Sequence, residues 1–509
     1  MKKNQPIIYS LLIVSGILIG TYIGDSPSEK SENTKLNGVL QLIESHYVDT
    51  LKTNFEDEVI SSILKELDPH STYIPKKEFQ SVSENMAGSF SGIGVQFNII
   101  EDSIVVVAAI SGGPSEKLGI QSGDRIVEVA GKDVASINIK NEGVIKRLRG
   151  EKGTTVEIKI LRRGNNSLLN FAIVRDDIPL YSVDASIMLS KDIGYIKVNR
   201  FSATTFDEFT KGANKLLSSG MQKLILDLRG NPGGYLGAAA SICDEFLKEN
   251  KLIVYTEGRN REKQEILATI NGAMHHTEVI VLINEGSASA SEIVAGALQD
   301  NDRGTIIGRQ SFGKGLVQEE IHLNDGSAVH ITTQRYYTPS GRCIQKPYGK
   351  NNKEYYLERY NRDSKKPFLD SLKFETAIGR TVYGGGGIAP DIIIKRDSTL
   401  NYSKINFMIA KGWVNTFAIT YADKNRTKWK GNSILFIEDV SLHFAVYDAF
   451  KSYAKRKDAD IDFKMGNTEK VYFMNLLKAN VARNIWDNEA YNKILIQEDE
   501  FVTEAIISF

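Results

Sequence analysis

The chain has 509 residues, of which 41% are hydrophobic and 25% are charged, and its formal net charge is zero. This composition is that of a soluble globular protein, and the length predicts two to four domains. A zero net charge provides no global basic field, so we expect no nucleic acid partner. The two cysteines, Cys243 and Cys343, exclude a disulfide framework and lie in no metal-ligand spacing. We expect both cysteines to be inert free thiols, with a single disulfide between them as the alternative.

The amino terminus differs from this average composition. Lys2 and Lys3 precede an apolar stretch, and no further charge appears before Asp25. A basic start followed by an apolar stretch of bilayer length predicts a signal-anchor or a signal peptide over residues 1–25. We favour an anchor in which residues 6–23 span the membrane, because no cleavage site or lipobox cysteine is evident. The positive-inside rule then places the rest of the chain outside the cytoplasm.

A polar linker over residues 26–35 precedes a section with the apolar spacing of amphipathic helices. This N-terminal helical section is expected over residues 36–84. It contains the stretch LDPHSTYIP, in which Asp68-Pro69 and Pro75 break the helical pattern.

Residues 85–176 have the texture of a small β-rich module, with short strands, two short helices and several turns. Residues 91–95 read SGIGV, and successive N–H groups in such a loop can form a nest for a terminal carboxylate. The segment GPSEKLGIQSGDRIVEVAG follows it closely. This module resembles a PDZ domain. The resemblance implies that Gly92, Ile93, Gly94 and Val95 bind a substrate carboxylate and that the adjacent strand edge pairs with an extended peptide.

Residues 177–396 repeat a strand–turn–helix pattern, which predicts a sheet of parallel strands connected by helices. Reactive groups in such sheets gather where strands end and helices begin. Residues 397–509 carry apolar and aromatic residues at helical spacing and predict a helical C-terminal section. That section shows no catalytic motif, and we interpret it as core and packing surface.

The segment NEGSASASEIVAG, residues 284–296, holds three serines between a buried strand and a helix. Ser289 and Glu292 fit a capping box, and on the helix start alone a cap is the favoured interpretation. A serine at this strand end is also well placed as a nucleophile, and the N–H of Ala290 would be free to bind an oxyanion. A second turn, NPGG at 231–234, supplies further N–H groups near Gly233 and Gly234.

Histidine is absent from this segment, so another group must take the proton of a nucleophilic serine. Lys314 lies between two glycines in SFGKGLVQ. A neutral lysine can act as the base for a serine. It would need its pKa lowered by roughly three units from about 10.4, and desolvation is the available cause. On residue type alone a surface lysine is the more common interpretation.

Five segments now occur in order behind the PDZ-like module: DLRGNPGG, GSASASEIVAGALQDN, SFGKGLVQ, RYYTPSGR and VYGGGGIAPDI. Together they resemble the carboxyl-terminal processing proteases, also called tail-specific proteases of peptidase family S41. The resemblance covers roughly residues 36–396. It implies a multidomain α/β chain with a crotonase/ClpP-like protease core, an inserted β-rich PDZ domain, and helical N- and C-terminal sections.

Carried over by position, the resemblance implies a catalytic set. Ser289 is the nucleophile, Lys314 the general base and Gln318 the residue that orients the lysine amine. The N–H groups of Gly234 and Ala290 form the oxyanion hole. The implied activity is a serine endopeptidase that cleaves proteins at or near their C-termini, with no cofactor and no metal.

The expected partners are proteins or peptides with free, apolar C-termini, and the membrane through the N-terminal segment. The implied location is the bacterial cell envelope, periplasmic or extracytoplasmic. The sequence is compatible with a homo-oligomer and does not fix the oligomeric state. Two alternatives remain: a PDZ adaptor with an inactive protease core, and a crotonase-like acyl-CoA enzyme, against which the exported N-terminus and the PDZ-like module argue.

Two histidines and two arginines have side chains that can transfer protons or bind a carboxylate. His275 and His276 precede the strand that leads to Ser289, at its far end, and we expect neither to be catalytic. Arg147 and Arg149 could pair with the substrate carboxylate or with the core, although a solvated helix face is favoured.

Overall fold

The computed structural model describes residues 35–349, 351–362, 370–396, 399–429 and 431–509. The expected anchor or signal peptide over 1–25 and the linker up to residue 34 lie outside the described residues. No helix within the described ranges is long and apolar enough to cross a membrane. The chain divides into two units, one ending at Ile63 and the other beginning at Leu64.

The first unit contains the helix α2 (Lys35–His46) and most of α3 (Phe55–Lys65), as the helical periodicity predicts. The second unit begins with the short strand β1 (Thr72–Ile74) and the helix α4 (Lys76–Ala87). The sequence did not predict β1. Three residues carry no readable periodicity, and β1 is recognisable only through its antiparallel pairing with the distant strand β18 (Ala328–Tyr337).

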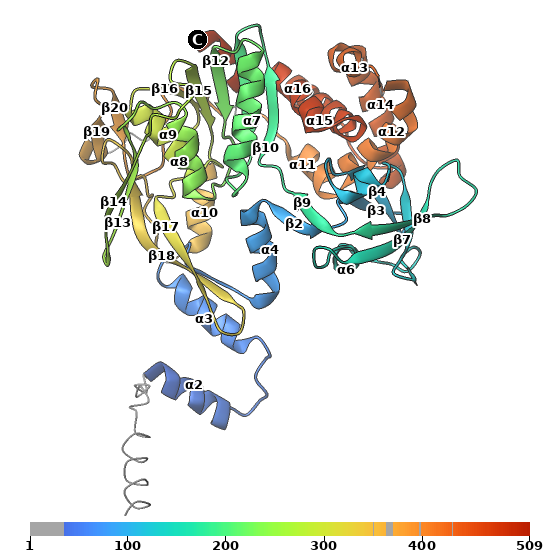
Figure 1. The fold of residues 1–509 in the computed structure, drawn as a ribbon, viewed down its shortest axis with the longest axis horizontal. Helices are drawn as coiled ribbons and strands as arrows, with labels where there is room; N and C mark the ends of the chain where they lie inside the picture. The colour runs from blue at the N-terminus through green and yellow to red at the C-terminus, as the bar shows by residue number, and fades with distance from the viewer. Residues whose placement is uncertain (1–34, 350, 363–369, 397–398, 430) are drawn as a thin grey trace, which may run out of the picture. The chain divides into compact units, whose positions relative to one another are not determined.

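The PDZ-like module forms a mainly antiparallel sheet with the order β3-β4-β5-β7-β8, and β6 pairs with β5. Its strands and helices are β3 (Val95–Ile100), β4 (Ser103–Ala109), α5 (Pro114–Lys117), β5 (Arg125–Val129), β6 (Lys132–Asp133), α6 (Asn141–Leu148), β7 (Thr155–Leu161) and β8 (Leu169–Val174). The chain enters through β2 (Ser89–Gly92) and leaves through β9 (Asp176–Pro179), which pair with each other. The paired entry and exit strands are those of an inserted domain (Figure 1).

The protease-like core contains a six-stranded sheet with the order β10-β11-β12-β15-β16-β21. All neighbours are parallel except β10 and β11, which confirms the predicted parallel sheet. The strands are β10 (Val183–Met188), β11 (Ile193–Val198), β12 (Lys223–Asp227), β15 (Glu278–Ile283), β16 (Gly304–Gly308) and β21 (Ile392–Ile393). The helices α7 (Thr205–Ser218), α8 (Leu236–Asp244) and α9 (Ala290–Asp300) connect them.

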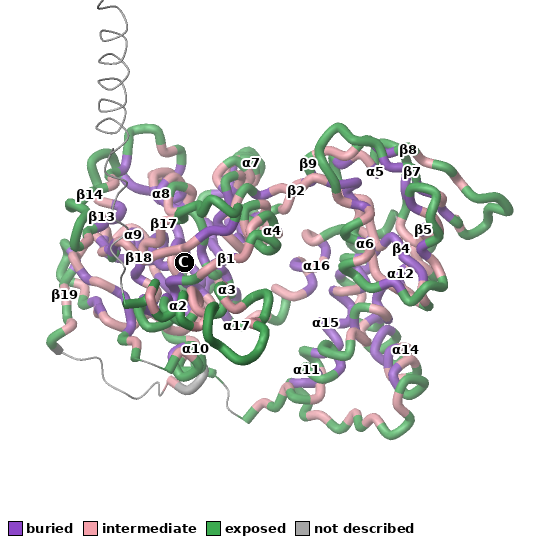
Figure 2. Tube along the Cα trace, turned by 90° about the horizontal axis from the view of Figure 1, so that it is seen from below, coloured by how far each residue is buried: buried purple, intermediate pink, exposed green. Residues whose placement is uncertain are grey.

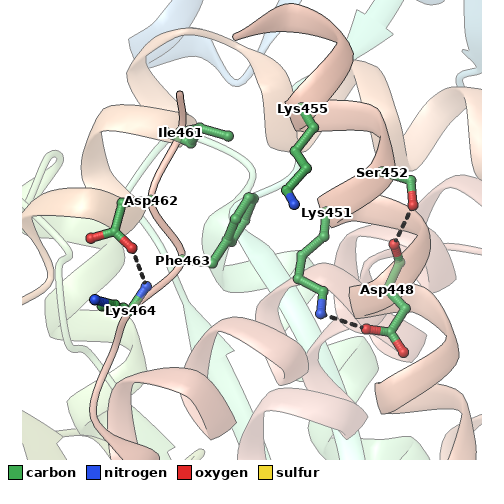
Figure 3. Close-up of a pocket in the computed structure, with 8 residues that line it drawn as sticks. All are labelled: Asp448, Lys451, Ser452, Lys455, Ile461, Asp462, Phe463 and Lys464. Atoms are coloured by element: carbon green, nitrogen blue, oxygen red, sulfur yellow. Dashed lines mark hydrogen bonds and ion pairs between the residues drawn. The ribbon is translucent and has the colours of Figure 1, made fainter. Parts of the chain in front are cut away.

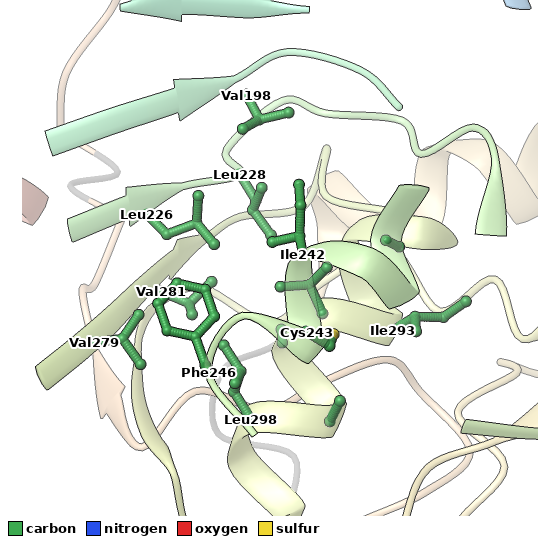
Figure 4. Close-up of a cluster of buried hydrophobic side chains, with 14 of the residues drawn as sticks. Val198, Leu226, Leu228, Ile242, Cys243, Phe246, Val279, Val281, Ile293 and Leu298 are labelled. Atoms are coloured by element: carbon green, nitrogen blue, oxygen red, sulfur yellow. The ribbon is translucent and has the colours of Figure 1, made fainter. Parts of the chain in front are cut away.

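Alternate side chains along each strand point to opposite faces of this sheet, and a separate apolar cluster buries each face. On β12, Leu224 and Leu226 pack into the cluster with α7, α8 and α9 that Figure 4 shows in part, whereas Ile225 belongs to a second cluster on the other face. The second cluster includes Phe501 and Val502 from the last helix, α17 (Glu500–Ser508). The C-terminus therefore returns to the protease-like core.

A second sheet, which the sequence did not predict, has the order β1-β18-β13-β14, and β17 also pairs with β18. Its remaining strands are β13 (Leu252–Gly258), β14 (Arg261–Leu267) and β17 (Leu316–His322). A two-stranded sheet of β19 (Lys373–Glu375) and β20 (Thr381–Tyr383) follows the helix α10 (Asn352–Asn361) and the short helix η1 (Asp370–Leu372).

The C-terminal section is helical, as predicted, and is built around one cluster of buried apolar side chains. Figure 2 shows the buried positions along its helices α12, α14 and α15. Before α17 its elements are α11 (Ser403–Ala410), α12 (Trp413–Trp429), α13 (Ser433–Glu438), α14 (Ser441–Lys457), α15 (Asn467–Ile485), α16 (Asn488–Leu495) and η2 (Ile496–Glu498). A cavity of about 680 Å³ lies between α14 and the segment before α15. Figure 3 shows the residues that line it, among them Phe463 and Lys451. Lys451 pairs with Asp448 at 2.9 Å. This cavity contains none of the predicted site residues.

Candidate active site

Ser289 lies between the end of β15 and the first residue of α9, at the position that the sequence predicts. Its backbone is held at φ 54° and ψ −113°, a conformation that non-glycine residues rarely adopt and that occurs often at functional sites. Its N–H donates to Glu292 Oε2 at 2.8 Å, so the carboxylate half of the predicted capping box is present. Ser289 is partly exposed, whereas every residue of α9 is buried.

The two neighbouring serines are buried and hydrogen-bonded. Ser287 Oγ donates to Leu228 O at 2.8 Å, and Ser291 Oγ donates to Asn231 O at 3.0 Å. Both contacts join the serine segment to the DLRGNPGG segment. Ser287 and Ser291 therefore connect the two loops, and Ser289 is the one of the three serines left partly exposed.

The loop 231–234 lies directly against Ser289. A Cβ atom placed on Gly233 would lie 2.8 Å from the Cβ of Ser289 and 3.0 Å from the amide nitrogen of Ala290, so only glycine fits. The Gly233 N–H donates to Asn231 Oδ1 at 2.8 Å. The N–H groups of Gly234 and Ala290 donate to no acceptor in the described part of the chain. Two unpaired donors therefore flank Ser289, as an oxyanion hole requires.

Lys314 lies in the loop before β17, and its amine donates to Gln318 Oε1 at 2.8 Å. Gln318 in turn donates through Nε2 to the carbonyl oxygen of His70. Burial lowers the pKa of Lys314 below its ordinary value, and the charges of Glu292 and Asp68 offset part of that shift. The hydrogen bonds of the described residues do not include one between Ser289 Oγ and Lys314 Nζ.

Two buried side chains hold the backbones of Ser289 and Lys314 together. Glu292 Oε2 accepts hydrogen bonds from the N–H groups of both residues, at 2.8 and 2.9 Å. The Tyr336 hydroxyl lies 3.1 Å from the carbonyl oxygen of Ser289 and 2.5 Å from that of Lys314. The sequence indicated Glu292 only as a cap and gave no indication of Tyr336, because both contacts depend on the tertiary fold.

The carboxylate of Glu292 also accepts from Gly313 N at 2.7 Å and from Ser311 Oγ at 2.5 Å, through Oε1. Burial raises the pKa of Glu292 above its ordinary value, and its hydrogen bonds to Ser311, Lys314, Gly313 and Ser289 reduce that shift only in part. Glu292 is thus a buried carboxylate that links the serine turn to the lysine loop.

His70 is a further buried group beside Lys314 that the sequence did not single out. Its Nε2 is paired with the Tyr355 hydroxyl at 2.8 Å, and its ring packs edge-on against Phe312 and Tyr355. Burial, with the Lys314 charge adding to it, lowers the pKa of His70 to about 4. Above about pH 4 the His70 imidazole is therefore neutral and adds no positive charge beside the Lys314 amine.

The predicted carboxylate-binding loop joins β2 to β3, an edge strand of the PDZ-like sheet. Gly94 has φ +74°, which favours glycine, and Ile93 is buried. Neither the Ile93 nor the Gly94 N–H donates to an acceptor among the described residues. An end strand beside unpaired amides is the arrangement to which an extended peptide with a terminal carboxylate can add.

One arginine differs from its expected setting. Arg149 is not on a solvated helix face: it pairs with Glu84 on α4 at 2.5 Å and lies over the Phe90 ring at 4.2 Å. The sequence could not show this, because Glu84 is 65 residues away. Arg147 bonds to Gly143 O within its own helix. His275 and His276 precede β15, at the opposite end of the strand from Ser289.

Comparison with known proteins now adds to this geometry. The model of peptidase family S41 matches residues 192–351, a PDZ-domain model matches 91–173, and a family of unknown function (DUF8443) matches 405–487. The carboxy-terminal processing protease CtpA of Bacillus subtilis is 35% identical over 386 residues, which cover 73% of this chain and 81% of that protein. The chain belongs to peptidase family S41, the carboxy-terminal processing proteases. It is a serine protease with a PDZ domain.

The chain is also similar to two further proteins. The carboxy-terminal-processing protease of Bartonella bacilliformis is 39% identical over 294 residues, which cover 57% of this chain and 67% of that protein. The solved photosystem II D1 C-terminal processing protease is 24% identical, with a TM-score of 0.37, and covers 71% of this chain and 87% of its own.

Proposed function

We propose that this S41 protease is an endopeptidase that cleaves proteins at or near their C-termini through a Ser289–Lys314 dyad. The observation that carries the proposal is the shared acceptor: one oxygen of Glu292 binds the N–H groups of both residues. Partly exposed Ser289 and desolvated Lys314 are the matching nucleophile and base. The hydrogen bond between them forms when substrate binds, because such contacts are often open in free enzymes.

The reaction begins when Ser289 Oγ attacks the scissile carbonyl carbon and its proton passes to Lys314 Nζ. The N–H groups of Gly234 and Ala290 stabilise the tetrahedral oxyanion. The Lys314 ammonium then protonates the leaving amine as the C–N bond breaks. In the second half, water attacks the acyl carbon and gives a proton to Lys314, and that proton passes to Ser289 Oγ as the bond between Oγ and the acyl carbon breaks and the carboxyl product leaves. Gln318 holds the amine by its 2.8 Å hydrogen bond.

The PDZ domain would select the substrate tail. In the proposal, the terminal carboxylate binds the loop of Gly92, Ile93, Gly94 and Val95, and the tail extends along β3. If an amidated peptide is bound and cleaved as well as the free acid with the same apolar end, carboxylate capture is wrong.

The proposed location is the bacterial cell envelope, outside the cytoplasm. It rests on the basic start and apolar stretch of residues 1–25, which lie outside the described residues. Fractionation of cells that express the full chain tests it: the protein is expected in the membrane fraction and accessible from the extracytoplasmic side.

The dyad is tested with a quenched fluorescent peptide that ends in Ala-Ala with a free carboxylate. We expect Ser289→Ala and Lys314→Ala to abolish cleavage while the variants still bind the peptide. Equal cleavage by the wild type and both variants would refute the dyad. An inactive wild type that binds the peptide would instead favour the adaptor alternative.

A further inference from the structure

The C-terminal helix α17 contacts both loops that build the active site. The first contact is through Arg229, which lies two residues after the end of β12 and directly precedes GNPGG. Arg229 Nη1 and Nη2 donate to the two carboxylate oxygens of Asp499, at 2.9 and 2.7 Å. Asp499 also caps α17 by accepting from Phe501 N at 2.9 Å. The carboxylate is therefore fixed on both sides, to the helix and to the loop.

Arg229 also binds a second carboxylate. It donates to the buried Asp227 through Nε at 3.0 Å and through Nη2 at 2.7 Å. Burial would raise the pKa of Asp227, but the charges of Arg229 and Lys197 outweigh it and hold that pKa well below its usual range. Asp227 thus stays ionised, and Arg229 is clamped between two carboxylates at the start of the proposed oxyanion loop.

The second contact is through Phe501. The Arg229 guanidinium lies 4.6 Å from the centre of its ring, and that of Arg309 lies 4.9 Å from it. Arg309 pairs through Nε with Glu285 Oε1 at 2.9 Å, and Glu285 belongs to the turn that carries Ser289. One aromatic ring therefore contacts two arginines, each tied to one of the two loops.

The backbone between these contacts is closely packed. A Cβ placed on Gly308 would lie 3.0 Å from the Phe501 ring and 2.1 Å from Ile283 O, so β16 passes close beneath the ring. Asn284 Oδ1 also accepts from Gly230 N at 2.9 Å and from Gly286 N at 3.0 Å, which joins the two loops directly. A shift of α17 would thus reach both loops.

We propose that Asp499 and Phe501 are positioning residues, which set the loop carrying the Gly234 donor against the turn carrying Ser289. They touch no substrate and act through Arg229 and Arg309. This inference rests on the proposed Ser289 mechanism. Its physical basis is that an oxyanion hole assembled from two loops works only when both are held in register, since a misplacement of about 1 Å can cost 10²-fold in rate.

The test compares Asp499→Asn and Phe501→Leu with matched controls on the same helix. Glu500→Gln removes an exposed carboxylate next to Asp499, and Ile507→Ala removes an exposed apolar side chain. We expect the first pair to lower kcat about tenfold or more with KM changed less than about twofold. The controls should match the wild type.

A fluorophosphonate probe separates positioning from folding. The final labelled fraction counts folded sites, and the labelling rate reports their alignment. We expect Asp499→Asn and Phe501→Leu to be labelled slowly but to the wild-type extent. Wild-type kcat in both, or a loss explained fully by a smaller labelled fraction, would overturn the inference. Ser289→Ala distinguishes a failure of this inference from a failure of the proposed function: if that variant still cleaves the Ala-Ala peptide, the proposed function itself is wrong.

Discussion

Glu292→Gln is the substitution that most directly perturbs the junction between the serine turn and the lysine loop. The native carboxylate accepts four hydrogen bonds, two at each oxygen, from Ser289 N, Lys314 N, Gly313 N and Ser311 Oγ. An amide has one acceptor oxygen and one NH₂ group. Whichever way it is oriented, two donors then face NH₂, and two bonds to a charged acceptor are lost.

The expected magnitude follows from these losses. A hydrogen bond to a charged group contributes about 1.5–3 kcal/mol, so two such bonds correspond to at least about 3 kcal/mol of positioning energy. Since 1.36 kcal/mol corresponds to a tenfold change, we expect kcat/KM to fall about 10²-fold. Buried donors also lose an acceptor in the folded protein, so the free energy of unfolding should fall as well, and activity is compared at a temperature at which both variants are folded.

The assay is cleavage of the Ala-Ala peptide, together with thermal unfolding. The control is Glu319→Gln on β17, the strand that follows Lys314, which removes a partly exposed carboxylate that pairs with Arg261. An activity of Glu292→Gln within about twofold of the control would refute the reasoning that Glu292 holds the two segments in register. So would a loss of activity that merely parallels unfolding.

Three further predictions concern titrating groups. Gln318→Glu places a carboxylate beside the Lys314 amine, so the pH at which kcat/KM reaches half its plateau should rise by about one to three units. The control Gln318→Leu should lower the plateau without such a rise, and an unshifted profile in Gln318→Glu would argue against Lys314 as the base. The pKa of His70 is lowered from 6.5 to about 4, so the free energy of unfolding should fall by roughly 3 kcal/mol as the pH decreases from 6.5 to 4. In denaturant unfolding, the free energy of His70→Gln should depend less on pH over this range than that of the wild type. Lys478 is fully buried, donates to the carbonyl oxygens of Ile437 and Asp439 at 2.9 Å, and has its pKa lowered by burial to about 8, with the Asp439 charge a partial offset. Its contribution to the unfolding free energy should therefore rise by roughly 3 kcal/mol between about pH 8 and 10.5, and the rise measured for Lys478→Met should be smaller than the wild-type rise by that amount.

Much of the site was accessible from the sequence because its information is local. The strand VIVLIN and the helix after it predict the serine-bearing turn between them, with Ser289 as a helix cap, and the glycines of NPGG indicate a turn that side chains would block. The choice of Ser289 among three serines, and of Lys314 as its partner, came from family resemblance. The structure adds a physical reason, since Ser287 and Ser291 are occupied in joining loops.

The contacts that the sequence missed are all long-range. β1 has three residues and is recognisable only through β18, which lies more than 250 residues away. The pairing of Arg229 with Asp499 spans 270 residues, and Asp499 by itself indicates no more than a helix cap. Arg149 was expected to be solvated because its partner, Glu84, lies outside the PDZ-like module. Such pairings depend on how elements pack, which periodicity does not encode.

The central claim is that Ser289 is the nucleophile and that Lys314 activates it. Fluorophosphonate labelling of the full chain over a range of pH, with peptide mapping by mass spectrometry, tests both parts together. The account predicts a single adduct on Ser289, a labelling rate that rises with pH through a pKa below 10.5, and negligible labelling of Lys314→Ala at neutral pH. An adduct on another residue, or wild-type labelling of Lys314→Ala, would contradict it.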